Sequence, residues 1–344
     1  MTIRWGILGC GDVCEVKSGP AFQHAPGSEL VAVMRRDKKL AEDFARRHGV
    51  PSFYDDAQRL IADPRVNAVY IATPPGSHLE LALEVAAHGK PAYVEKPMAR
   101  THAECVRMVE AFDRASLPLF VAYYRRGLAR FLKAKEIVDS GRLGTICDVS
   151  YRLAHAGQKN LDRNNLAWRL RPEPAGAGLF LDLGSHTLDL LDFFFGPLED
   201  VEGRAENVAS NCDVEDRVVL SFRTASGALG SASWNFVSQA SEDLIRIQGT
   251  SGELRLSTFG NEPVELSTQD GVERFDLPNP RHIQQPLIET VVGALEGRTS
   301  CASSGVSAAR TSTVMDRALA GYYGSREDGF WLHPERWPGR RARV

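Results

Sequence analysis

The first 120 residues alternate short apolar runs with longer amphipathic runs, and this alternation restricts the fold more than any other feature. Apolar runs such as Ile3–Leu8 are nearly continuous, which is typical of strands buried on both faces. The run Lys38–His48 has helical spacing and is followed by Gly49, a common helix terminator. The pattern predicts a parallel, doubly wound α/β sheet. We expect strands at 3–8, 30–34, 68–72, 92–94 and 119–122, with helices from the first loop to about His24 and over 38–48, 77–88 and 101–115.

The pattern changes after residue 122. Val218, Leu220 and Phe222 alternate with polar positions, which predicts a largely antiparallel sheet with one buried face. We therefore expect two domains, an α/β domain over residues 1–122 and an α+β domain over residues 123–344. In the second domain we expect helices at 128–139, 179–195, 283–295 and 306–322, and a series of strands between 201 and 277 that includes 217–222, 229–236, 244–248 and 253–256.

Charge, hydropathy and cysteine usage exclude several classes of protein. The net charge of −3 over 344 residues leaves no electrostatic footprint for nucleic acid, and the basic group Arg340, Arg341 and Arg343 is expected to be a solvated tail. No apolar stretch approaches the ~18 residues that span a bilayer. The chain enters its first strand at Ile3, without room for a signal peptide, and its six scattered cysteines form no Cys-x-x-Cys pair. We expect a soluble cytoplasmic protein with free thiols and no nucleic-acid or membrane partner.

A glycine-rich loop joins the first strand to the first helix, the position at which such loops bind dinucleotides. Its glycines permit a tight turn and a close backbone approach to a pyrophosphate. Cys14 replaces the third glycine and is small enough for close helix–strand packing. Cys10 and Cys14 could have lowered thiol pKa values near a helix N-terminus, although we favour bystander thiols. The expected cofactor contacts here are Gly9, Gly11, Asp12 and Val13.

The residues after the second strand bear on the choice of nicotinamide cofactor. Enzymes that use NAD place an acid there to accept from the ribose 2′-hydroxyl. This chain has Arg35 and Arg36, whose guanidinium groups suit a 2′-phosphate. A solvated surface pair is the alternative, and Asp37 is the ribose acid if the strand ends later than expected. We expect NADP, with NAD as the alternative.

Two further loops follow strands at the edge where open α/β sheets bind ligands. Thr73 and Pro74 end the strand at 68–72 in a rigid loop, and His78 is expected in the first turn of the next helix. Lys96 follows the strand at 92–94 and could stabilise an alkoxide formed during hydride transfer. A surface ion pair with Glu95 is the alternative for this lysine.

The helix expected at 179–195 carries ionisable groups on an otherwise apolar element. Asp182 and His186 lie four residues apart on one helical face, which Asp189 shares. Histidine can transfer a proton near neutral pH, and a carboxylate can orient the ring. Hydrogen bonding within the core and metal ligation are the alternatives, but no third ligand is evident, and we expect no metal.

Together the Gly9-Cys10-Gly11, Glu95-Lys96-Pro97 and Gly178-x3-Asp182-x3-His186 motifs resemble the glucose–fructose oxidoreductase / inositol dehydrogenase / rhizopine-catabolism (Gfo/Idh/MocA) family over nearly the whole chain. The resemblance implies a Rossmann domain and a C-terminal α+β domain with an open, mostly antiparallel sheet. In this family the C-terminal sheet often forms the subunit interface, which implies a homodimer or homotetramer.

The resemblance also implies roles for individual residues. Lys96 would anchor the reacting oxygen, Asp182 would orient the substrate and His186 would be the general acid or base. Arg35 matches the members that use NADP, whereas Tyr123, with Tyr124 after it, stands where many members have an asparagine. The positions that match the segments passing the nicotinamide ribose or framing the lysine are Thr73, Pro74, His78, Glu95 and Pro97.

The substrate pocket is expected to include Trp168 and Arg169, an aromatic face beside a donor fork, together with Tyr123 and Arg125. Ordinary interface packing is the alternative for each. We expect an NAD(P)-dependent enzyme that prefers NADP and transfers hydride to or from a sugar, polyol or related carbonyl or alcohol. The alternatives are an NAD-dependent glycosidase of the same fold and a catalytically silent dinucleotide sensor.

Overall fold

The structure, a computed structural model, describes residues 2–159, 161–327 and 329–340, with the side chain of residue 163 left out. Arg341 and Arg343 of the basic tail lie outside the described residues. The chain forms two compact units that are each discontinuous in sequence. The first unit consists of Met1–Ala99, Ala103–Leu128 and Asn279–Ala309, and the second of Arg100–His102, Ala129–Pro278 and Arg310–Val344.

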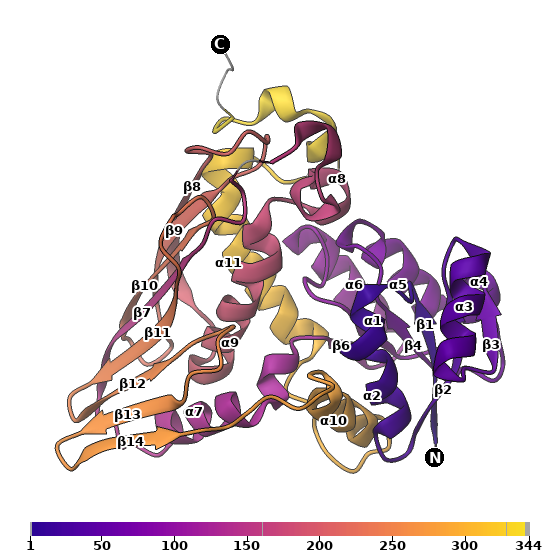
Figure 1. The fold of residues 1–344 in the computed structure, drawn as a ribbon, viewed down its shortest axis with the longest axis horizontal. Coiled ribbons are helices and arrows are strands. Elements are labelled where there is room, and N and C mark those ends of the chain that lie inside the picture. The colour runs from indigo at the N-terminus through magenta and orange to yellow at the C-terminus, as the bar shows by residue number, and fades with distance from the viewer. Residues whose placement is uncertain (1, 160, 328, 341–344) are drawn as a thin grey trace. The chain divides into compact units, whose positions relative to one another are not determined.

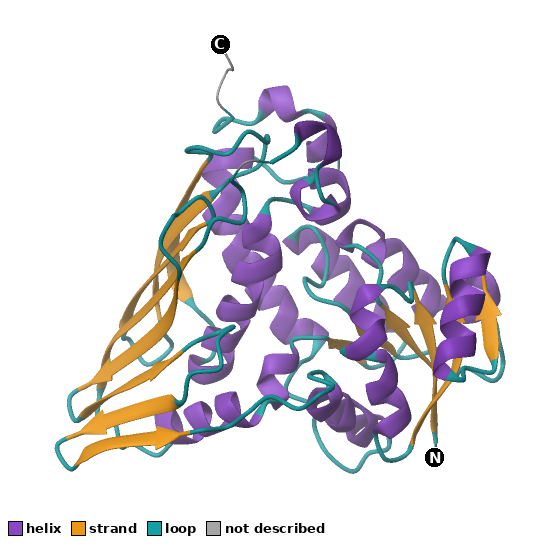
Figure 2. Ribbon diagram, viewed as in Figure 1, coloured by secondary structure: helices purple, strands orange, loops and turns teal. Residues whose placement is uncertain are grey.

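The first unit contains a parallel six-stranded sheet, as the alternation of apolar and amphipathic runs predicts (Figures 1 and 2). The order β3-β2-β1-β4-β5-β6 reverses direction between β1 and β4, which is the switch point where doubly wound sheets bind dinucleotides. The strands are β1 (Ile3–Leu8), β2 (Ser28–Met34), β3 (Ser52–Tyr54), β4 (Ala68–Ile71), β5 (Ala92–Val94) and β6 (Leu119–Val121).

The helices of the first unit differ from expectation in two places. The single helix expected up to His24 is two short helices, because the chain breaks at Ser18 and Pro20 starts the second one. The strand β3 and the helix α4 were not expected, since three and five residues are too few to show a period. The helices are α1 (Asp12–Val16), α2 (Gly19–His24), α3 (Lys38–His48), α4 (Ala57–Ile61), α5 (His78–Ala87), most of α6 (His102–Arg114) and α10 (Gln285–Leu295).

An aromatic layer covers part of the parallel sheet in the first unit. Trp5, Phe22, Tyr70 and Tyr93 are all fully buried. The Tyr70 and Tyr93 rings stack at 5.2 Å, and the Phe22 ring lies 5.0 Å from that of Tyr70. Burial of side chains this large stabilises the unit by roughly 2 kcal/mol each. Three of these rings belong to β1, β4 and β5, the strands that are followed by the expected active-site loops.

The segment 279–309 returns to the first unit from far along the chain. Its helix α10 lies beside α2 (Figure 1). Ser304 forms a β-bridge with Phe120, and the backbone N–H of Val121 donates to the carbonyl of Ser303 at 3.1 Å. Our expected domains, residues 1–122 and 123–344, did not anticipate this return. The segment therefore adds a last edge to the sheet beside β6.

The second unit contains an open eight-stranded sheet in the order β14-β13-β12-β11-β7-β10-β9-β8 (Figure 1). All neighbours are antiparallel except β7 and β10. Val218, Leu220 and Phe222 are buried while the residues between them are exposed, which confirms the expected alternation. The strands are β7 (Ile146–Ala154), β8 (Glu199–Glu206), β9 (Arg217–Arg223), β10 (Leu229–Asn235), β11 (Glu242–Gly249), β12 (Gly252–Leu256), β13 (Val264–Thr268) and β14 (Gly271–Phe275).

The second unit differs from expectation at strand β7, which was not predicted, and at one helix, which begins differently. We expected strands only after residue 201, so β7, which precedes the helical region, was missed. The helix expected at 179–195 begins instead with a π-helical turn, Phe180–Gly184, before α9 continues it. Among the described helices, none is both long enough and apolar enough to cross a bilayer. The helices of this unit are α7 (Ala129–Asp139), α8 (Pro172–Ala175), α9 (Ser185–Phe195) and most of α11 (Gly305–Tyr323).

Candidate active site

The glycine loop lies between β1 and α1 and is tied to the end of β2. The backbone N–H groups of Gly9 and Cys10 donate to the carbonyl of Met34 at 2.9 and 3.1 Å. Gly9 has a φ of +89°, and a Cβ there would lie 2.8 Å from Thr73 Cγ2, so only glycine fits. A Cβ on Gly11 would meet only the Gly9 carbonyl oxygen at 3.9 Å. Protein packing does not require glycine at position 11, but a closely approaching pyrophosphate does, and this loop therefore fits a dinucleotide.

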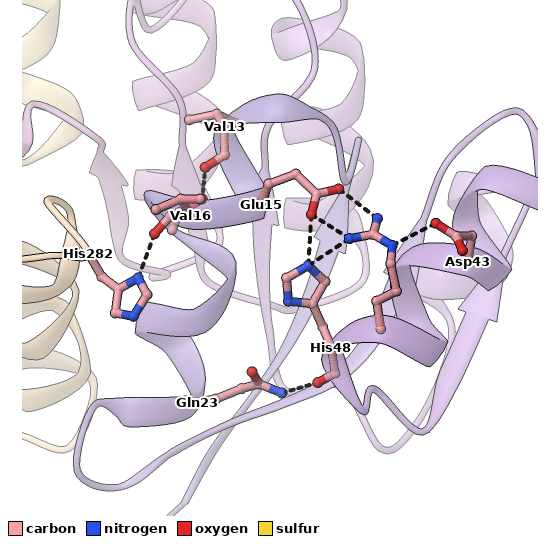
Figure 3. Close-up of polar contacts among 9 residues, drawn as sticks. Val13, Glu15, Val16, Gln23, Asp43, His48 and His282 are labelled. Atoms are coloured by element: carbon pink, nitrogen blue, oxygen red, sulfur yellow. Dashed lines mark hydrogen bonds and ion pairs between the residues drawn. The ribbon is translucent and has the colours of Figure 1, made fainter.

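The short helix α1, which starts at the exposed Asp12 and the half-buried Val13, is held from two directions (Figure 3). Arg47 of α3 donates to both carboxylate oxygens of Glu15 at 2.7 and 2.8 Å, and the His48 ring lies 2.9 Å from the same carboxylate. The Arg47 guanidinium lowers the pKa of Glu15 to about 2. At the other end, His282 Nδ1 lies 2.6 Å from the carbonyl oxygen of Val16.

The two cysteines of the glycine loop are buried, and their burial determines their pKa values. Desolvation raises the pKa of Cys10 to about 11, with the nearby Arg35 charge opposing it. Desolvation also raises the pKa of Cys14 well above its ordinary value. The suggestion that a helix N-terminus lowers these thiol pKa values is therefore wrong, because burial outweighs it.

The arginines after β2 lie where the sequence predicts. Strand β2 ends at Met34, so Arg35 is the first residue beyond it, and its backbone N–H donates to the Tyr54 carbonyl at 3.1 Å. The Asp37 carboxylate caps α3 by accepting from two backbone N–H groups at 3.0 and 3.3 Å. Arg35 is half-buried and its charge acts on Cys10 in the glycine loop, whereas Arg36 is exposed. Asp37 is thus engaged in capping, and Arg35 is the residue beside the loop.

His78 is the first residue of α5, as expected, and it joins two loops at the carboxyl edge of the sheet. Its Nε2 lies 2.7 Å from the Thr73 carbonyl oxygen, beside Pro74, and its Nδ1 lies 3.1 Å from that of Met98. The ring is fully buried, and desolvation lowers its pKa although both carbonyls favour the protonated form. His78 therefore fastens the loop after β4 to the loop after β5.

Glu95 holds the peptide that precedes the half-buried Lys96. Only 7% of Glu95 is exposed. Its Oε1 accepts from the Tyr70 hydroxyl at 2.5 Å and from Gln284 Nε2 at 2.6 Å, while Oε2 accepts from the backbone N–H of Lys96 at 3.1 Å. The Lys96-Pro97 peptide is cis. Glu95 is a buried anchor with three donors and not the surface carboxylate of the alternative interpretation.

Tyr123 and Arg125 follow β6, so they belong to the same carboxyl edge of the first unit's sheet. Both are buried, and the Arg125 guanidinium lies 4.9 Å from the centre of the Tyr124 ring. The loops after β1, β4, β5 and β6 thus gather at one edge because all four strands are parallel. The first unit places every expected cofactor contact there or beside the end of β2.

In the second unit, Arg169 contacts two other expected site residues, Asp182 and Trp168. Arg169 Nε lies 3.1 Å from Asp182 Oδ2, and its guanidinium lies 4.5 Å from the Trp168 ring centre. Asp182 lies in the π-helical turn, so the α-helical face expected for Asp182 and His186 is altered; such turns are frequent at functional sites. His186 is 4% exposed, and its ring packs edge-on against Phe259 at 5.8 Å. Within the described residues, no three His, Cys, Asp or Glu side chains gather as metal ligands would.

A buried carboxylate secures the segment that leads into the π-helical turn. Both oxygens of Glu215 accept from the backbone N–H of Gly178 at 3.0 and 3.1 Å, and the Tyr323 hydroxyl donates to one of them. A Cβ on Gly178 would lie 2.7 Å from the Glu215 carbonyl oxygen, so glycine is required there. Burial raises the pKa of Glu215 to about 7 against these hydrogen bonds.

Sequence reasoning missed three residues that support the site: Tyr70, Gln284 and Glu215. Tyr70 has the apolar neighbours of any buried strand residue. Gln284 is 189 positions from the carboxylate it contacts, and Glu215 is 37 positions from Gly178. Only a pattern of covariation between distant positions could indicate such pairs, and one sequence contains none.

Comparisons with known proteins agree with this architecture. Residues 3–123 match the model of an oxidoreductase family with an NAD-binding Rossmann fold, and residues 131–255 match the GFO/IDH/MocA C-terminal domain. The chain is 39% identical to oxidoreductase P35 of Formosa agariphila, covering 91% of this chain and 97% of that protein. It is 27% identical to 1,5-anhydro-D-fructose reductase of Ensifer adhaerens, covering 88% and 91%.

A solved structure of a levoglucosan dehydrogenase in complex with NADH has the same fold. It superposes with a TM-score of 0.81 at 22% identity and covers 93% of this chain and 96% of that one. Three observations agree with one another: the matches to the two family models, the Rossmann strand order and the glycine loop. The chain belongs to the Gfo/Idh/MocA family and is an NAD(P)-dependent oxidoreductase.

Proposed function

We propose that the protein prefers NADP and transfers hydride between the nicotinamide and a hydroxyl-bearing or carbonyl carbon of a sugar, polyol or related compound. One observation carries the proposal: the glycine loop, open beside Gly11, shares the carboxyl edge of one parallel sheet with Lys96. The buried Glu95 fixes the backbone of that lysine. A cofactor loop and a lysine with a fixed backbone at one sheet edge support hydride transfer with charge stabilisation at the reacting oxygen.

The proposed roles follow from the chemistry of each side chain. A bound nicotinamide supplies or accepts the hydride. The Lys96 ammonium donates to the substrate oxygen and stabilises the negative charge that grows there. In the second unit, His186 gives a proton to that oxygen in reduction and removes it in oxidation, and Asp182 orients the substrate. Arg169, whose Nε lies 3.1 Å from Asp182 Oδ2, directs that carboxylate.

The substrate class is inferred from the second unit and from one named relative. Trp168 offers an aromatic face, and Arg169 beside it offers a fork of N–H donors, a combination that suits a ring with several hydroxyl groups. Tyr123 and Arg125 are proposed to complete the binding residues. The relative from Ensifer adhaerens is named for reduction of an anhydrosugar. Assembly as a homodimer or homotetramer through the eight-stranded sheet stays a prediction, for which molar mass in solution is the direct measurement.

A panel of anhydrosugars, aldoses, ketoses and polyols tests the reaction class. With the correct substrate we expect stoichiometric gain or loss of nicotinamide absorbance, matched mole for mole by product. An NAD-dependent glycosidase would cleave a glycoside with no net change in nicotinamide redox state. A catalytically silent sensor would bind the dinucleotide and turn over no substrate. Either of these outcomes would contradict the proposed dehydrogenase.

Cofactor choice is tested at Arg35. Because the guanidinium beside the glycine loop would make charge-assisted hydrogen bonds to a 2′-phosphate, Arg35→Ala should weaken NADPH binding by about tenfold or more. NADH binding should change little. Lys39→Ala removes a charge from an exposed position on α3 and is the matched control. Fluorescence titrations of both dinucleotides decide the question, and tighter binding of NADH by the parent protein would refute the preference.

A further inference from the structure

The segment 279–309 contacts the candidate site at His282, which lies against α1, and at Gln284. This segment lies outside both family matches, which end at residues 123 and 255. The backbone N–H of Gln284 donates to the Lys17 carbonyl at 3.3 Å, at the end of the helix that follows the glycine loop. Its side-chain Nε2 donates to Glu95 Oε1 at 2.6 Å. A single residue therefore contacts both the glycine-loop helix and the acid before Lys96.

The surroundings of Gln284 favour a role beyond holding α10 in place. The side chain is 1% exposed, and among the described residues its Oε1 has no hydrogen-bond partner. A buried polar atom without a partner is unfavourable, so packing alone would be served better by an apolar side chain. The amide supplies a neutral donor to Glu95. It therefore holds the carboxylate without adding a charge that competes with Lys96.

The other donor to the same oxygen is equally constrained. Tyr70 is fully buried in the aromatic layer, where desolvation and then the Glu95 charge raise its pKa well above the ordinary value. Its hydroxyl therefore stays protonated and keeps donating. With Tyr70 and Gln284 on Oε1, the Oε2 atom is left to accept from the Lys96 backbone N–H. The position of that peptide thus depends on both donors.

We propose that Gln284 is a positioning residue that acts through Glu95 to set the place of Lys96. The inference rests on the proposed function, because it presupposes that Lys96 contacts the reacting oxygen. The competing interpretation is that Gln284 only fastens α10 to the sheet. In that case its loss would lower stability and leave the chemical step unchanged.

Gln284→Met in the full-length protein removes the side-chain donor, keeps the chain length and retains the backbone bond to Lys17. We expect kcat to fall by tenfold or more while the dissociation constant for the dinucleotide stays within twofold. Gln285→Met is the matched control, since this neighbouring half-buried glutamine donates to Glu289 at 2.9 Å, away from Glu95. A variant whose kcat equals that of the parent would overturn the proposal.

A second variant supplies a readout that a structural role would not change. Gln284→Glu places two carboxylates together, so they must share a proton. Because that proton is lost as the pH rises, kcat of this variant should fall with rising pH. The loss of kcat in Gln284→Met should not depend on pH. The other titratable groups around Glu95 are Tyr70, Tyr93, Cys14, His78 and the adjacent Lys96. If Gln284→Met does not fold, Tyr70→Phe removes the other donor to Oε1 and must show the same loss of kcat. A parent protein without turnover would instead refute the proposed function.

Discussion

Lys96→Met should lower kcat/KM by about 100- to 1,000-fold, the usual loss when one charge-stabilising donor is removed from an active site. Methionine keeps the length and apolar stem of lysine, so packing around the cis peptide is retained. The loss should appear mainly in kcat, because the ammonium interacts most strongly with the charge that develops during hydride transfer. Steady-state kinetics with the best substrate of the panel measure kcat and KM, and a dinucleotide titration measures cofactor binding.

The control for this variant lies at the other end of the same strand. Lys90 precedes β5, is also half-buried, and donates to the carbonyls of Ile61 and Asp63 at 2.5 and 2.8 Å. Lys90→Met should therefore lower stability while kcat/KM stays near the parent value. Unchanged turnover in Lys96→Met would restore the sensor interpretation and remove the proposed role of this lysine.

Glu215→Gln should change how stability depends on pH. The pKa of Glu215 is raised from 4.5 to about 7 in the folded protein. The protonated carboxyl therefore contributes fully to the stability of the folded state below pH 4.5, and this contribution is lost as the pH rises through 7. The difference corresponds to about 3 kcal/mol of unfolding free energy. Glutamine cannot ionise and can still accept from Gly178, so the variant should gain stability relative to the parent as the pH rises from 5 to 8.

Urea unfolding across that pH range measures the effect as the difference in unfolding free energy between parent and variant. The difference is needed because His78, whose pKa is lowered by burial, contributes in the opposite direction as pH falls through 6.5. Glu15 and Asp63, with pKa values of about 2, do not titrate in this range. Glu202→Gln, at an exposed position of β8, is the control. Parallel curves for parent and Glu215→Gln would show that the buried carboxylate does not titrate there.

The sequence predicted the elements whose burial is uniform or strictly periodic. The run Ile3–Leu8 and the helix Lys38–His48 were expected with the bounds they have, because continuous apolar residues and a glycine in the left-handed region define them. The strand β7 was missed although Val149, Tyr151 and Leu153 are buried and alternate with polar residues, because strands were expected only after residue 201. The π-helical turn was missed because it has no distinct composition, so nothing separated Asp182 from an ordinary helix.

The candidate site was predictable where the chemistry is local in the chain. The glycine loop and Lys96 each stand directly after a strand, so their place at the sheet edge follows from the strand order. The residues that hold them come from elsewhere. Gln284 and Glu215 act through contacts with sequence positions far away, and no local pattern in one chain reports such contacts.

The return of residues 279–309 to the first unit has a consequence for the order of synthesis. A chain emerging from the ribosome presents β1 through β6 long before it presents Ser303, which donates to the Val121 carbonyl, or Gln284, which donates to Glu95. The nucleotide-binding half of the molecule is therefore complete only after the strands of the other half have been made. Completion of the N-terminal unit during synthesis must therefore await the segment 279–309.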